Sequence, residues 1–209
     1  MEPANACDFS ELANTLMHSR QHVAPRRLLA PGPNVAQLAS ILATAAAAPD
    51  HGQLLPWRFV EVQLSSRALL ADVFGQALIE RDAQASAEQL LAARDKAHRA
   101  PCLMLAIARL CGSDVQREAE RALAGELRVS DAERLVSLGC AIQNMLLSAH
   151  AMGFGSGLTS GQALSSTGLR QLFSLQNHEQ AVCFVNIGSV SKIKPARLRP
   201  PATAFFSSL

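Results

Sequence analysis

Lysine is scarce in this chain. Of the 19 basic residues, 16 are arginines and three are lysines, Lys96, Lys192 and Lys194. None of these lysines follows a glycine, which excludes a phosphate-binding P-loop. The net charge of +2 is too small for bulk electrostatic attraction to nucleic acid or to a membrane surface. We therefore expect no nucleic acid and no membrane among the partners.

The sequence also lacks the cysteine patterns of metal and redox sites. Its five cysteines form no C-x-x-C pair. Cys102, Cys140 and Cys183 lie in apolar runs, where a thiol behaves as a small hydrophobic group. No basic region followed by an apolar stretch opens the chain, and no apolar run is long enough for a membrane span. We expect a cytoplasmic protein.

Several catalytic motifs are absent as well. The glycines between residues 153 and 161 suggest a dinucleotide-binding loop, but Ser160 stands where G-x-G-x-x-G requires glycine, and the stretch follows a predicted helix instead of a strand. No G-x-S-x-G elbow is present. His18 and His22 could share a helix face, but no third metal ligand accompanies them at a matching spacing. A Rossmann site, a hydrolase elbow and a metal centre are all disfavoured.

The composition favours a globular fold, because 49% of the residues are hydrophobic and 17% are charged. The 209 residues contain no internal repeat and no interior linker, so a single domain over 1–209 is expected. Periodicity and capping residues predict helices at 9–19, 34–47, 66–80, 86–98, 131–152 and 167–174, and strands at 57–64, 102–110 and 181–187. Helices outnumber strands and should surround them, as in an α+β domain.

The predicted helix at 131–152 has features of a helix that packs against another helix. Its apolar positions recur at spacings of 3 and 4, and it carries small residues such as Gly139 and Ser148 that allow close approach. One 209-residue monomer does not readily cover so much apolar surface. We expect a homodimer in which the tail at 189–209 packs on the partner subunit.

Three segments carry a more specific pattern. Residues 19–33 contain Ser-Arg-Gln-His, then Arg-Arg-Leu and Pro-Gly-Pro. Residues 48–59 read A-P-D-H-G-Q-L-L-P-W-R-F, and residues 153–161 contain G-F-G followed by L-T-S-G after the long helix. Their order and spacing resemble the nitroreductase family, especially its short single-domain members. With the strand that ends near Gly188, the resemblance covers nearly the whole chain.

The resemblance implies a nitroreductase-like fold, with a central, mostly antiparallel sheet flanked by helices in an interlocked homodimer. It also implies an FMN site between the two subunits and hydride transfer from NADH or NADPH through the flavin to an electron-poor small molecule, a nitroaromatic or a quinone. Two alternatives stay open. One is a non-catalytic flavin-binding protein, and the other is a relative that fragments flavin or dehalogenates its substrate.

The family's flavin contacts can be carried over residue by residue. Arg20 matches an arginine that meets the flavin phosphate, and His22 stands where the family has serine. His51 matches a histidine that contacts the flavin, and residues 158–160 match a segment expected from the partner chain. Ala47 stands where some relatives have arginine. The expected cofactor-binding residues are Arg20, Gln21, His22, Ala47, His51, Leu158, Thr159, Ser160 and Arg199.

These residue types suit the chemistry. An arginine can bind a phosphate through two charge-assisted hydrogen bonds, each about twice as strong as a neutral one. The flavin itself carries out the hydride chemistry, so the protein needs to supply geometry, dipoles and access. The sequence accordingly predicts no catalytic acid, base or nucleophile among its own residues.

Overall fold

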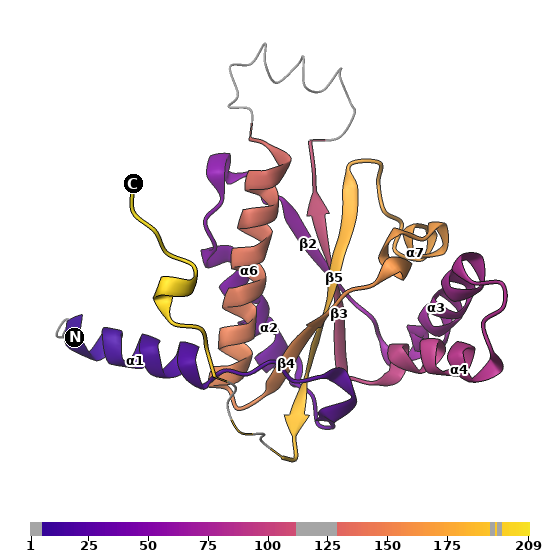
Figure 1. Ribbon diagram of the computed structural model, residues 1–209, viewed down its shortest axis with the longest axis horizontal. Coiled ribbons are helices and arrows are strands. Elements are labelled where there is room, and N and C mark those ends of the chain that lie inside the picture. Colours follow the sequence, from indigo (N-terminus) through magenta and orange to yellow (C-terminus); the bar gives the residue numbers. More distant parts are fainter. Residues whose placement is uncertain (1–5, 112–128, 193–194, 196–197) are drawn as a thin grey trace, which may run out of the picture.

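Helices cover both faces of one sheet, which confirms the α+β fold class (Figure 1). The computed structural model describes residues 6–111, 129–192, 195 and 198–209. The helices are α1 (Ala6–Ser19), α2 (Val35–Ala43), α3 (Arg67–Arg81), α4 (Ala87–Asp95), α6 (Asp131–Ala151) and α7 (Thr167–Leu172). The strands are β1 (Leu28–Leu29), β2 (Trp57–Glu61), β3 (Cys102–Arg109), β4 (Gly155–Thr159) and β5 (Glu179–Val190).

The long strand β5 organises the sheet. It pairs antiparallel with β3, β4 and β1, and β3 pairs antiparallel with β2. Ile187 of β5 has Cys102 of β3 as one partner and Ser156 of β4 as another, so β3 and β4 lie on opposite edges of β5. The predicted central antiparallel sheet is confirmed.

Strand β3 separates two hydrophobic cores. Its side chains alternate, because successive residues of a strand point to opposite faces. Met104 and Ala106 belong to the core under α2 and α6, whereas Leu105 and Ile107 belong to the core under α3 and α7. All but the last residue of β3 are buried, as the nearly continuous apolar run predicts.

Helix α6 lies along one face of the sheet (Figure 1). It begins with a capping box, in which the Ser130 side chain accepts from the Glu133 amide and the Glu133 side chain accepts from the Ser130 amide. Leu138, Ile142 and Met145 are buried. Val136 remains 66% exposed, so one side of α6 is not covered within the chain.

No strand was predicted in the glycine-rich residues 153–161, yet β4 occupies five of them. Gly153 ends α6 at a φ of 85°. A Cβ on Gly155 would lie 2.2 Å from Val190, and a Cβ on Gly157 would lie 2.3 Å from the Val23 carbonyl oxygen. The strand therefore needs glycine for close packing, a requirement that strand propensities do not reveal.

The other predicted elements form with shifted ends. The strand predicted at 57–64 ends at Glu61, and the helix predicted at 34–47 finishes as a 3₁₀ turn, η2 (Thr44–Ala47). The strand predicted at 181–187 extends over 179–190. The two-residue strand β1 was not predicted, because it forms only where Leu28 and Leu29 meet the far end of β5.

Candidate functional site

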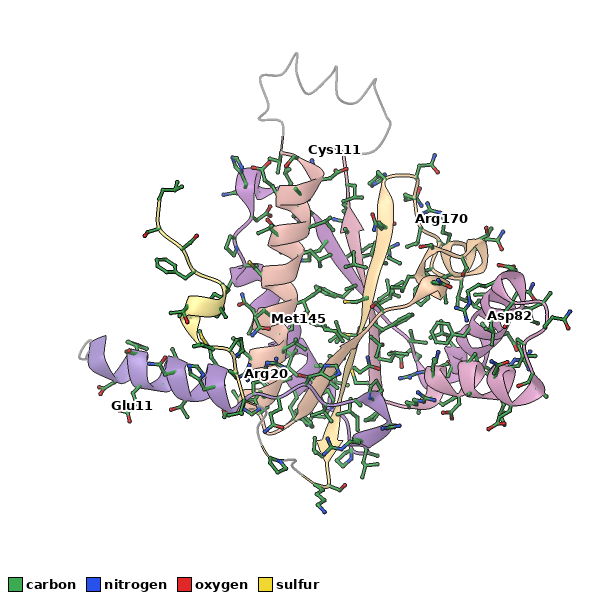
Figure 2. All side chains as sticks on the ribbon, in the orientation of Figure 1. Glu11, Arg20, Asp82, Cys111, Met145 and Arg170 are labelled. Atoms are coloured by element: carbon green, nitrogen blue, oxygen red, sulfur yellow. The ribbon has the colours of Figure 1, made fainter. Side chains whose placement is uncertain are left out.

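Arg20 lies where α1 ends, beside the C-terminal part of α6 (Figure 2). The neighbouring Ser19 hydroxyl is 2.7 Å from Nε2 of His150, in the last turn of α6. Nη2 of Arg199, from the C-terminal tail, donates to the Arg20 carbonyl oxygen at 2.8 Å. Three segments distant in sequence thus bring Arg20, Arg199 and His150 together.

These basic groups perturb one another. Burial, and secondarily the Arg199 charge, lowers the pKa of Arg20 below its usual value. Burial and then the charge of Arg20 lower the pKa of His150. Within the described part of the chain, neither Arg20 nor Arg199 forms an ion pair with a carboxylate. An uncompensated arginine pair of this kind favours an anionic ligand.

The segment after Arg20 runs beside β4. His22 forms a parallel β-bridge with Ser156, and the Val23 amide donates to the Ser156 carbonyl at 2.9 Å. Gly157 is packed so closely that an added Cβ would lie 2.9 Å from the His22 ring. His22 therefore lies against the strand that leads to residues 158–160 in the same chain.

Residues 158–160 continue from the strand that His22 borders in the same chain. That they reach the flavin of the partner chain remains a prediction. Three residues separate Ser156 from Thr159, or about 10 Å at the usual strand rise. Thr159 Oγ1 accepts from the Asn186 amide at 3.1 Å, and Leu158 and Ser160 are exposed.

A pocket of about 460 Å³ opens at the end of β4, between that strand and the α3–α4 helix pair. Its volume lies within the range of small-molecule sites. Thr159 and Ser160 are part of its wall, and so is Pro25, which follows His22 by three residues. The pocket therefore adjoins the segment that carries Arg20 and His22.

His51 and Ala47 lie elsewhere in the chain. Nδ1 of His51 is 3.2 Å from a carboxylate oxygen of Glu133, in the first turn of α6. Glu133 and His150 are 17 residues apart on the same helix, which corresponds to about 25 Å. Ala47 is exposed at the end of η2, and Thr44 of η2 accepts a hydrogen bond from Asn144 of α6. A single chain therefore does not bring His51 to Arg20.

The loop that carries His51 is held in an uncommon conformation. Gln53 and Leu55 have positive φ angles of 52° and 45°. The Asp50 carboxylate accepts hydrogen bonds from the Leu54 and Leu55 amides at 3.1 and 2.8 Å. Positive φ at a leucine is energetically unfavourable, and strain of this kind clusters at ligand-binding sites. The geometry marks this loop as a second region of interest.

Sequence reasoning missed some residues of the site. It gave no role to His150 or to the pocket residues Arg81, Lys96 and Arg99. No local spacing could have revealed them, because each lies on a different segment from β4 and Arg20. Gln21, by contrast, was expected in the site and adjoins Arg20 in sequence.

Two other kinds of site find no support in the described ranges. Those residues contain no group of three or more His, Cys, Asp or Glu side chains arranged to hold a metal ion. They also include no helix whose length and apolar character would suit a transmembrane span.

The chain is similar to known proteins over most of its length. The family model described as "Nitroreductase family" matches residues 20–189. A Haemophilus influenzae protein provisionally named NAD(P)H nitroreductase is 32% identical over 177 residues, which is 85% of this chain and 88% of that protein. The provisionally named NAD(P)H nitroreductase YdjA of Escherichia coli is 29% identical over 163 residues, covering 78% of this chain and 81% of YdjA.

Solved structures show the same fold. A nitroreductase-like family protein from Bacillus cereus superposes with a TM-score of 0.75 at 18% identity, over 100% of this chain and 98% of that one. A BluB-like flavoprotein from Clostridium difficile gives a TM-score of 0.64 at 19% identity, over 94% and 98%. The family match, which spans the arginine at the end of α1, the His51 loop and β4, shows that the chain belongs to the Nitroreductase family.

Proposed function

We propose that the protein is an FMN-dependent oxidoreductase that takes hydride from NADH or NADPH and reduces an electron-poor small molecule. The family supports an oxidoreductase in general, and the names of the Haemophilus influenzae and Escherichia coli relatives specify NAD(P)H. The observation that carries the flavin assignment is the pair Arg20 and Arg199, which has no carboxylate partner in the described chain and lies beside the strand that enters the pocket.

The residues fit the cofactor. Arg20 and Arg199 supply the charge that a phosphate requires, and His22 adds a donor on the same segment, next to Gln21. Thr159 and Ser160 line the pocket and Leu158 precedes them on β4, so these residues would help to hold the flavin. FMN would supply two-electron redox chemistry when bound. The chain's own residues would bind it, orient it and restrict the access of water.

The overall reaction balances without a catalytic acid or base on the protein. A nitroaromatic acceptor would follow ArNO₂ + NAD(P)H + H⁺ → ArNO + NAD(P)⁺ + H₂O, in which a nitrogen–oxygen bond breaks and the nicotinamide loses two electrons and a proton. A quinone would gain the same two electrons and two protons to give the hydroquinone. The chemistry belongs to the cofactor, so positioning is the main task of the chain.

The active form would be a homodimer, because the remaining predicted contacts need a partner subunit. His51 lies at the end of α6 opposite to Arg20, about 25 Å away along the helix. A second copy placed antiparallel on the exposed side of α6 would bring its own His51 loop to the first copy's Arg20. We expect an interface above roughly 2,000 Å² in total, as is usual for obligate dimers.

Exposed apolar groups support such an interface. Phe9 and Leu12 of α1 are 60% and 63% exposed, and Phe205 in the tail is 75% exposed. Large exposed apolar patches mark interaction surfaces. The tail at 189–209 is proposed to pack on the partner subunit.

A cytoplasmic location is also proposed. The free thiols of Cys102 and Cys183 suit the reducing conditions of that compartment.

The first experiment is an absorption spectrum of the purified protein, followed by chromatography of the released cofactor. We expect flavin absorption bands in the spectrum, and the released cofactor should be FMN. Addition of NADH or NADPH without oxygen should bleach those bands. A nitroaromatic or a quinone should then restore them. A protein that binds FMN but is not reduced would be a non-catalytic flavin carrier, and a protein that does not bind micromolar FMN would contradict the whole proposal.

A further inference from the structure

The pocket at the end of β4 has an apolar floor and a basic rim. Leu103 and Phe184 on its floor are buried, and Phe184 packs edge-on against Phe74 with ring centroids 5.7 Å apart. Arg81 and Lys96 on its wall are exposed to solvent. A ligand in this pocket would therefore meet buried apolar side chains below and positive charge at the opening.

The charged residues described on the pocket wall are all basic. Among the described residues that line it, Arg81, Lys96 and Arg99 are charged, and no aspartate or glutamate is present. Arg99 forms an ion pair with Asp95 at 2.9 Å. Among the described residues, Arg81 and Lys96 take part in no ion pair, and Arg81 instead donates to the Gln162 side chain at 2.9 Å. Two cations are thus free to attract an anionic group.

A buried arginine fixes the backbone that carries part of this rim. Arg67, at the start of α3, is 2% exposed and donates to the carbonyl oxygens of Val62 at 2.8 Å and Ala97 at 2.7 Å. Arg67 donates a further hydrogen bond to a backbone carbonyl oxygen in the segment just after Arg99. Because these bonds tie the Lys96–His98 turn (η5) to the sheet, Lys96 and Arg99 are held in place before any ligand binds.

We propose that this pocket selects planar aromatic acceptors that carry a carboxylate or sulfonate, with Arg81 and Lys96 as the specificity-determining residues. The inference rests on the proposed function, since it names the acceptor class of the same oxidoreductase site. The aromatic body would lie on the floor formed by Leu103 and Phe184, and the anionic group would point to the rim. The electrons would come from NAD(P)H, in the balance given above.

Equilibrium binding tests the proposal without turnover. The probes are 2-naphthoate and its neutral analogue 2-naphthamide, titrated by calorimetry into flavin-loaded protein. Exposed ion pairs contribute about 0.2–1 kcal/mol each. Wild type should therefore prefer naphthoate, and the double variant Arg81→Gln/Lys96→Gln should lose about 2- to 30-fold of naphthoate affinity with little change for naphthamide. The preference of the wild type for naphthoate over naphthamide should weaken at high salt.

A matched control is available on α4. Arg94→Gln removes one positive charge from a residue outside the pocket, whose ion-pair partner is Asp72. It should leave both dissociation constants at their wild-type values. Since Arg81 also bonds Gln162, the single variant Lys96→Gln separates loss of charge from loss of local structure.

The kinetic test compares 4-nitrobenzoate with 4-nitrobenzamide. The ratio of their kcat/KM values should fall in the two rim variants and stay unchanged in Arg94→Gln. Equal binding of the charged and neutral probes by wild type would overturn the proposal. Two other results would also overturn it: reduced affinity for FMN and riboflavin in the rim variants, which would assign the cations to the cofactor, or a rise in KM for NADPH but not NADH with unchanged naphthoate binding, which would assign them to the donor's phosphate.

Failure of this inference is distinguishable from failure of the proposed function. A protein without flavin or without NAD(P)H-dependent reduction contradicts the proposed function. If the protein reduces neutral and anionic acceptors equally well, the proposed function stands and only the proposed acceptor class is contradicted.

Discussion

The two ends of α6 carry charge in different ways. At the N-terminal end, His51 faces Glu133, and the Glu133 carboxylate also accepts bonds from the Ser130 side chain and backbone. These bonds, chiefly those from Ser130, lower the pKa of Glu133 to about 2. At the C-terminal end, Arg20 and Arg199 lie together with His150, and the described chain offers them no carboxylate.

The difference is between an acidic group that is paired locally and a basic pair that is proposed to bind a ligand. The acidic group at the start of α6 is satisfied locally and is also favoured by the helix dipole. At the other end, the dipole supplies only about half a negative charge against two guanidinium groups. Among the described residues the second end therefore has no full negative charge, and a phosphate would supply one.

Removal of Arg20 should have the largest effect. Arg20→Ala should weaken FMN binding by about 1.5–3 kcal/mol, or roughly 10- to 150-fold, the range for a hydrogen bond to a charged group. Riboflavin lacks the phosphate, so it should bind wild type and variant equally. Fluorescence titration with both flavins measures this. Arg26→Ala, an exposed arginine nearby on η1 (Pro25–Arg27), is the matched control. Unchanged FMN affinity in Arg20→Ala would place the phosphate elsewhere.

Mixed subunits test whether the two ends of α6 meet across a dimer. Arg20→Ala and His51→Asn chains, each weak in FMN binding, should be refolded together. If each site combines Arg20 of one chain with His51 of the other, one site of the mixed dimer carries both substitutions and the other carries none. About half of the sites in mixed dimers should then recover wild-type affinity, as measured by flavin content. No recovery would mean that both residues act within the same chain.

Loss of the α6 cap should have a moderate effect on stability and none on the phosphate site. Ser130→Ala removes the hydroxyl that accepts from the Glu133 amide at 3.3 Å. Loss of an N-cap costs about 1 kcal/mol, which lowers the Tm by about 2–4 °C in a protein of this size. Calorimetry of the flavin-free protein measures the shift. A large fall in FMN affinity in this variant would show that the two ends are coupled.

The smallest expected effect is a titration shift. Arg20→Ala removes one of the two causes that lower the pKa of His150, so that pKa should rise part of the way toward its usual value, while the effect of burial persists. Because the folded-state pKa is lowered, wild type should lose stability as pH falls below about 6.5, and the variant should lose less. Histidine ring NMR measures the pKa, with Arg26→Ala again as control. An unchanged pKa would mean that Arg20 and His150 are not coupled.

Much of the fold followed from local patterns. The apolar run at 102–110 predicted a strand buried on both faces, and the asparagine before residue 35 predicted the start of α2, where a capping box forms. The resemblance carried by residues 48–59 pointed to the family that the comparison confirms. The flavin contacts themselves remain predictions that the experiments above test.

The sequence alone determined the types of the longer elements other than β4, because periodicity and capping are local properties of a chain. Only the tertiary structure decided that Gly155 and Gly157 form a strand, since the reason is the close approach of Val190 and Val23. It also decided that Arg199 contacts Arg20 and that residues 158–160 follow the strand beside His22. His51, in contrast, contacts the opposite end of α6. Contacts between residues more than a hundred positions apart depend on how the layers pack, and local spacing carries no information about that.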